Sequence, residues 1–182
     1  MLTTFRQSRG FGIHSPFAFA LTTQVLRSRD RYYALKELEE SVSGSRFFIS
    51  GDMRCAALLF RLAMYFYPAH INFHGDEVPP CIRESATKAL NNITKPGNPD
   101  ILHYYNIGHE GNDEGLIGSI SEGKPFLSVI DMRHTGGDKR KKLISDIVAS
   151  LPFGMTFLSR ERLMIVTALP HLPRQNFKVN VK

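Results

Sequence analysis

The chain has 182 residues, of which 42% are hydrophobic and 22% are charged, and its formal net charge is +6. This composition excludes a disordered or fibrous protein, and the length fits a single domain over residues 1–182. The two cysteines, Cys55 and Cys81, are too few for a secreted disulfide framework. We expect both to be small buried residues rather than catalytic thiols.

Basic residues gather in two places. Residues 1–31 carry five arginines against one acidic residue, and residues 139–142 are all basic. The second group opens a predicted helix with an apolar inner face, which indicates a solvated surface rather than a nucleic-acid contact. The longest apolar stretch near the start, residues 17–21, is far below the ~18 residues that a membrane span needs. We therefore expect a cytoplasmic protein without membrane or nucleic-acid partners, while self-association stays open.

The first 50 residues are expected to form a helical arm in front of an α/β core of residues 51–182. Ser15-Pro16 predicts a helix start, with serine as the N-cap and proline at the first helical position. Apolar spacing then predicts helices over 17–26, 31–42 and 52–67. The last of these is apolar nearly all round, so we expect it to be buried.

From residue 70 onward, predicted strands and helices alternate. This alternation predicts an α/β fold with a mostly parallel sheet that is covered on both faces. The loop at 170–176 predicts that the last two strands form an antiparallel hairpin. The predicted strands are 70–74, 101–105, 126–130, 155–158, 163–169 and 177–181, and the predicted helices are 77–92, 114–121 and 138–151.

Six patches of the sequence are distinctive, and the N-terminal segment that contains GIHSPF is the most specific of them. The patches are 9–17 (RGFGIHSPF), 31–35 (RYYAL), 58–62 (LLFRL), 65–68 (YFYP), 129–134 (VIDMRH) and 175–179 (QNFKV). Together they resemble a group of bacterial class I methyltransferase-like proteins that use S-adenosyl-L-methionine (SAM). The resemblance implies a Rossmann-like class I methyltransferase sheet, preceded by N-terminal helices and ending in an antiparallel hairpin.

The cofactor loop departs from that family's pattern. A working member has an acidic residue and a glycine-rich turn after the first strand, because a Cβ there would collide with the cofactor. Here residues 70–77 (HINFHGDE) contain one glycine and are followed closely by Pro79-Pro80. Either the turn is degenerate, or the turn and its helix are deleted and Asp76 or Glu77 ends the next strand. The residues left to contact SAM are Gly75, Asp76, Glu77 and Asp131.

Asp131 and His134 follow a predicted central strand, at the sheet edge where α/β proteins bind ligands. A functional interpretation makes Asp131 a contact to substrate or metal and His134 a general base. The alternative is a polar turn that leads into a helix. The family's motif has a glycine after the aspartate, whereas this chain has Met132, and Arg133 stands before His134.

The histidines do not have the spacing of a metal site. His70 and His74 would lie about 13 Å apart on one strand, which is too far to share an ion. Together, these patterns predict a methyltransferase-like protein with a degenerate cofactor loop and weak or lost SAM binding and catalysis. Two alternatives remain: an active SAM-dependent methyltransferase with an atypical cradle, and a non-enzymatic basic module that binds an acidic partner.

Overall fold

The computed structural model describes residues 14–28, 32–42, 50–75, 77–90, 98–108 and 114–181. The first helix of the described residues is α1 (Pro16–Ala20), which continues into the π-helix η2 (Leu21–Leu26) and is followed by α2 (Tyr33–Val42) and α3 (Ser50–Phe66). The predicted start of α1 is confirmed, because Pro16 occupies its first turn and the Ser15 hydroxyl accepts a hydrogen bond from the Ala18 amide at 3.3 Å.

Six described strands form one mostly parallel sheet in the order β1-β2-β3-β5-β4-β6, and β5 runs antiparallel to both of its neighbours. The predicted bounds of β1 and α5 are confirmed to the residue. The strands are β1 (His70–His74), β2 (Ile101–Asn106), β3 (Phe126–Asp131), β4 (Met155–Ser159), β5 (Leu163–Ala168) and β6 (Gln175–Val179), and the helices between them are α4 (Pro80–Ala89), α5 (Glu114–Ser121) and α6 (Gly137–Ser150).

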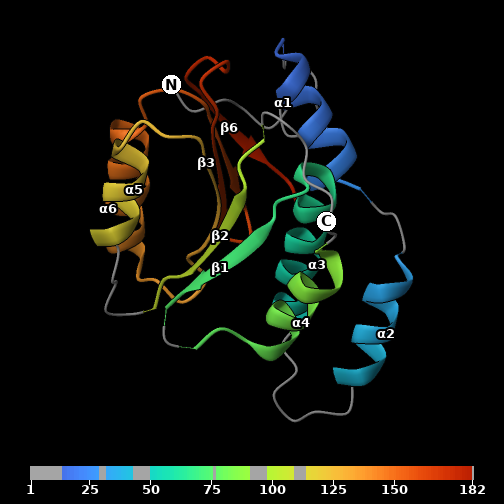
Figure 1. Ribbon diagram of the computed structural model, residues 1–182. Helices are drawn as coiled ribbons and strands as arrows, with labels where there is room; N and C mark the ends of the chain where they lie inside the picture. The colour runs from blue at the N-terminus through green and yellow to red at the C-terminus, as the bar shows by residue number, and fades with distance from the viewer. Residues whose placement is uncertain are drawn as a thin grey trace.

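Helices cover the sheet on both faces, as the alternating pattern predicts (Figure 1). Helices α1, α3 and α4 pack on one face, where Tyr104 and Val129 belong to their core, and α2 packs on the outer side of α4 (Figure 1). Helices α5 and α6 pack on the other face, against Tyr105 and Ile130. Successive side chains of each strand point to opposite faces, so one sheet serves two hydrophobic cores.

The predicted hairpin between the last two strands is wrong. β5 instead forms the hairpin with β4, through a short turn in which Arg162 adopts a positive φ of 64°. β5 also pairs with β3, so both of its edges are occupied. β6 therefore pairs with the other edge of β4, and it runs parallel to that strand.

The first crossover of the sheet has the opposite hand to the next two. The path β1-β2-β3-β4 moves in one direction along the sheet, but α4 lies on one face and α5 and α6 on the other. Since about 98% of such crossovers are right-handed, the connection through α4 is the left-handed exception (Figure 1). A right-handed connection through α4 would lead to the outer side of β1, where the described sheet ends.

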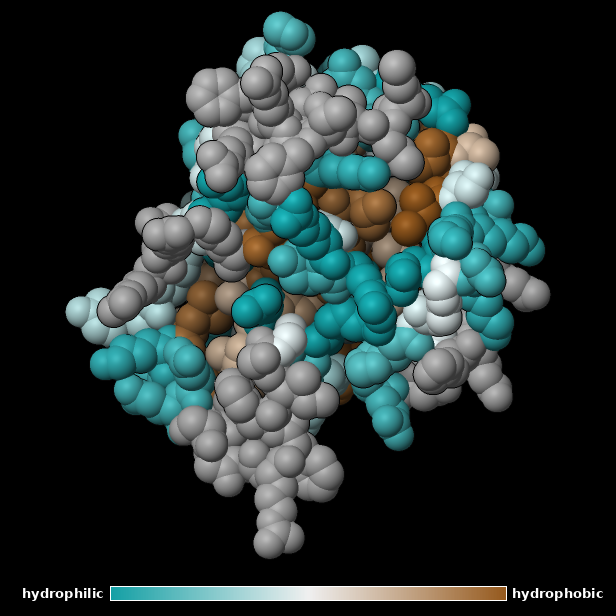
Figure 2. Space-filling model, turned by 180° about the vertical axis from the view of Figure 1, so that it is seen from behind, coloured by the Kyte–Doolittle hydropathy of each residue, from teal (hydrophilic) through white to brown (hydrophobic). Residues whose placement is uncertain are grey.

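Polar side chains dominate the face turned away from the view of Figure 1, with apolar side chains visible on either side of a polar band (Figure 2). The large apolar side chains that are exposed among the described residues are Phe19, Tyr33 and Leu90. Within the same ranges, none of the helices combines the length and the hydropathy that crossing a bilayer requires.

A substitution of Gly154 tests the packing of the β4–β5 hairpin. The φ of Gly154 is +97°, and a Cβ there would lie 2.6 Å from the Ala168 Cα and collide with the Thr167 carbonyl oxygen. We expect Gly154→Ala to lower the free energy of unfolding by well over ~1 kcal/mol, because left-handed strain adds to a clash with backbone. The control is Gly123→Ala, where φ is +69° but no atom lies within 4 Å. Equal losses in urea denaturation would contradict this account.

Candidate functional site

The carboxyl ends of β1 and β2 are the expected place for a ligand. Their connections leave toward opposite faces, through α4 and α5 respectively, and such a divergence opens the crevice in which α/β proteins bind ligands. Gly75 and Glu77, two of the predicted cofactor contacts, lie at the end of β1. The third, Asp76, lies outside the described residues.

Asn106, at the end of β2, connects this strand to the segment that follows β1. Its side-chain amide donates to the Glu77 carbonyl oxygen at 2.7 Å. Gly75 adopts φ +105°, and a Cβ there would lie 2.5 Å from the Asn106 carbonyl oxygen. The one glycine of the predicted loop is therefore required by its positive φ and by its close approach to a neighbouring strand.

Asp131 lies at the end of β3 as predicted, but its carboxylate is fully engaged within the protein. The residue is 1% exposed. Oδ1 accepts from the Arg133 amide at 3.0 Å and from Arg133 Nε at 2.9 Å. Oδ2 accepts from Arg133 Nη2 at 2.6 Å and from the Tyr104 hydroxyl at 2.9 Å. Because a carboxylate offers about four acceptor positions, little capacity is left for a ribose, a substrate or a metal ion.

Arg133 also joins the sheet to helix α3. Its Nη2 lies 2.8 Å from Oδ1 of Asp52, in the first turn of that helix. A Cβ on Gly51 would lie 2.6 Å from Arg133 Nη1, so a glycine at that position leaves room for the guanidinium. Burial alone would lower the pKa of Arg133, but hydrogen bonds and charge from Asp131, together with Asp52, raise it above its usual range. Arg133 is thus a permanent cation between two carboxylates.

Tyr104 and Cys55 complete this buried cluster on the inner side of α3. The Cys55 thiol lies 3.8 Å from the Tyr104 hydroxyl. Burial raises the pKa of Cys55 and the pKa of Tyr104, and the charge of Asp131 raises both further. A thiol held protonated at neutral pH is a poor nucleophile. The expectation that Cys55 and Cys81 are buried residues is confirmed.

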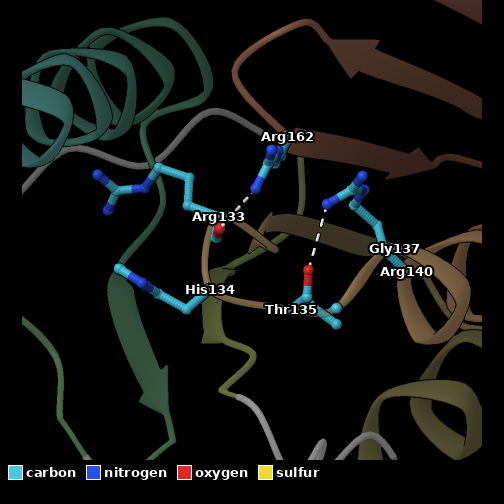
Figure 3. A pocket seen from close by; sticks show the side chains of 7 residues that line it. Arg133, His134, Thr135, Gly137, Arg140 and Arg162 are labelled. Atoms are coloured by element: carbon cyan, nitrogen blue, oxygen red, sulfur yellow. Dashed lines mark hydrogen bonds between the residues drawn. The ribbon is translucent and has the colours of Figure 1, made fainter.

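His134 does not meet Asp131 in a catalytic pair. It is exposed, whereas Asp131 is buried toward α3. The turn that holds His134 forms one wall of an open pocket of about 420 Å³. Figure 3 shows the His134 ring pointing away from Arg140 and Arg162, which lie on the opposite side of this pocket. The pocket is lined by Arg133, His134, Thr135, Gly136, Gly137, Arg140 and Arg162.

A stack of rings lies where β1 and β2 pair. His74 is opposite Tyr105 in the register, with ring centroids 4.1 Å apart, and His74 Nε2 lies 2.9 Å from His103 Nδ1. His103 also stacks on Phe126 at 4.9 Å. Burial lowers the pKa of His103 to about 4, with a further contribution from His74. In the described ranges, no three His, Cys, Asp or Glu side chains come together as a metal site.

Sequence reasoning identified Asp131 and missed its partners. A charged residue that ends a fully buried strand has to be paired, and this signal was available for Asp131. The identity of the partners was not, because Tyr104 reaches Asp131 from the neighbouring strand β2, and because Asp52, which shares Arg133 with Asp131, lies 79 residues earlier in the chain. Asn106 and the His74–His103 contact were missed because both depend on the register between β1 and β2. Comparison of the chain with protein-family models, curated proteins and solved structures finds no significant match.

Removal of the Arg133 charge should destabilise the fold strongly. Arg133→Met leaves the buried carboxylates of Asp131 and Asp52 without their cation, and we expect a loss of about 3–5 kcal/mol in the free energy of unfolding. The control is Lys142→Met on the exposed side of α6, for which a change within ~0.5 kcal/mol is expected. Urea denaturation followed by circular dichroism measures both, and an unchanged Arg133→Met variant would refute the role of this ion pair.

His103 should make the protein less stable in mild acid. Its pKa falls from 6.5 to about 4 on folding, so the unfolded chain binds more protons than the folded chain in that window. Stability is therefore full above 6.5 and declines as the pH falls toward 4. We expect His103→Gln to reduce the loss of melting temperature between about pH 7.5 and about pH 5. His70→Gln, at the exposed start of β1, is the control; equal pH profiles for all three proteins would contradict the assignment.

Proposed function

We propose that this chain is a shortened class I methyltransferase-like domain that has lost its SAM site and no longer catalyses methyl transfer. The observation that carries the proposal is that the Asp131 carboxylate is buried and already hydrogen-bonded within the protein. Methyl transfer from SAM depends mainly on holding cofactor and acceptor in line, because the leaving group is already activated. A strand-end carboxylate that is buried and bound by Arg133 and Tyr104 cannot contribute to that positioning.

The left-handed crossover through α4 supports one of the two alternatives for the cofactor loop, in which the turn and its helix are deleted. If a longer ancestor carried further strands on the outer side of β1, a right-handed connection through α4 would have led to them. Removal of those strands would leave α4 on its original face and connect it to β2, on the other side of β1. A left-handed crossover with β1 at the sheet edge is the arrangement that such a deletion produces.

The contacts between β1 and β2 support the same proposal. A nucleotide cofactor needs main chain that it can approach closely, without a Cβ or a neighbouring strand in the way. Gly75 packs against Asn106 instead, and the Asn106 side chain binds the Glu77 carbonyl. Among the predicted cofactor contacts, the Asp131 carboxylate and the Glu77 carbonyl are thus engaged within the protein, whereas the Glu77 side chain is exposed.

Calorimetric titration of the full chain with SAM and with S-adenosylhomocysteine tests this proposal. We expect no saturable binding tighter than about 100 μM, which corresponds to about −5.5 kcal/mol. A working class I methyltransferase, titrated in the same buffer, shows that the ligands are intact. A cooperative melting transition shows that the chain is folded. A dissociation constant below about 100 μM for either ligand would refute the loss of the site.

A further inference from the structure

We infer that Arg140 and Arg162, with the first-turn amides of α6, form a pocket for the phosphate group of a small phosphorylated molecule. The two arginines come from different elements, α6 and the turn between β4 and β5, and both line the open pocket of about 420 Å³ beyond the end of β3 (Figure 3). This volume lies within the range of ~300–1,000 Å³ that is typical of small-molecule sites.

Neither Arg140 nor Arg162 forms an ion pair with any carboxylate in the described ranges. Arg133 differs, because Asp131 and Asp52 neutralise it and its guanidinium points away from the other two (Figure 3). Two like charges on one pocket repel each other unless an anion lies between them, so the pocket is electrostatically prepared for an anion.

Main-chain contacts hold both guanidinium groups in place and leave most of their donors free. Arg140 Nη1 donates to the Thr135 carbonyl oxygen at 3.2 Å, and Arg162 Nη1 donates to the Arg133 carbonyl oxygen at 3.1 Å. Thr135 is itself fixed, because its hydroxyl donates to the Ile107 carbonyl oxygen at 2.8 Å. A guanidinium has five N–H donors. Donors that are already positioned lose less conformational entropy when a ligand binds.

The start of α6 adds further donors on the same wall. Gly136 is its N-cap, and no side chain caps the helix there. The Asp138 side chain is fully exposed and pairs with Lys141 at 3.2 Å. Gly136 and Gly137 carry no side chain, and the space that a Cβ would take is open at both positions. Free amides and the helix dipole favour an anion at this end.

Phosphate is the anion that this arrangement fits best. The planar guanidinium fork matches two phosphate oxygens at once, and two such forks with backbone amides can bind one tetrahedral group from several sides. The lining contains no large apolar side chain, which indicates a polar ligand rather than an adenine ring. Polynucleotides are bound along basic stripes that follow successive phosphates, whereas these two arginines meet in one pocket.

Titration of the full chain with glycerol 3-phosphate and with inorganic phosphate, followed by ¹H–¹⁵N NMR, tests the inference. We expect saturable shifts of amides in the first turn of α6. Arg140→Gln and Arg162→Gln should each weaken binding by about tenfold. Lys142→Gln removes the same charge from the exposed side of α6 and should change the affinity by less than about twofold. Arg162→Lys keeps the charge without the fork and should fall between the wild type and Arg162→Gln.

Three results would overturn the inference. One is the absence of saturable binding to the folded wild-type chain. Another is an equal loss in Lys142→Gln and Arg140→Gln, which would indicate diffuse attraction to a basic protein. The third is tighter binding of a short oligonucleotide than of glycerol 3-phosphate, with the same losses in both arginine variants. None of these results depends on SAM, so this inference and the proposed loss of the cofactor site can fail separately.

Discussion

The ion pair of Arg133 with Asp131 and Asp52 is the interaction on which the rest of this sheet edge depends. It connects the end of β3 to the first turn of α3, and all three groups are largely shielded from water. Removing one partner from a buried pair typically costs several kcal/mol, because the remaining charge stays buried and unpaired. The guanidinium therefore fixes how α3 lies on the sheet, and it fixes the orientation of Asp131 as well.

The Arg133 guanidinium lies between two regions of the structure that are adjacent in the sequence. On the α3 side, Asp131, Tyr104 and Cys55 form a closed cluster whose hydrogen-bonding groups satisfy one another. On the other side, the turn from Arg133 to Gly137 opens toward solvent and is flanked by Arg140 and Arg162. The aspartate, which would serve a methyltransferase-like site, is structural in this chain. The proposed phosphate pocket instead uses Arg140 and Arg162, which form no ion pair with a carboxylate among the described residues.

Local patterns predicted most of the secondary structure. The five-residue strand HINFH and the Ser15-Pro16 helix start carry their signals in neighbouring residues, and the structure confirms both. The pairing of the last strand was predicted wrongly, because the choice of partner depends on which strand edges are free. Residue order does not reveal that β5 lies between β3 and β4. The candidate site was predictable to a similar extent. The position of Asp131 followed from the sequence, but the bridge that Arg133 forms from Asp131 to Asp52, 79 residues earlier, did not.

The central proposal is that the Asp131 carboxylate, which a cofactor site at this sheet edge would use, is already held by Arg133 and Tyr104. A crystal structure of the full chain grown with SAM at a concentration of about 5 mM, far above the ~100 μM expected of a functional site, tests it most directly. The account predicts that Arg133 still bridges Asp131 and Asp52, that Asn106 still contacts Glu77, and that no nucleotide lies between the ends of β1 and β2. A SAM molecule in that crevice, with Asp131 released from Arg133 or Asn106 displaced from Glu77, would contradict it.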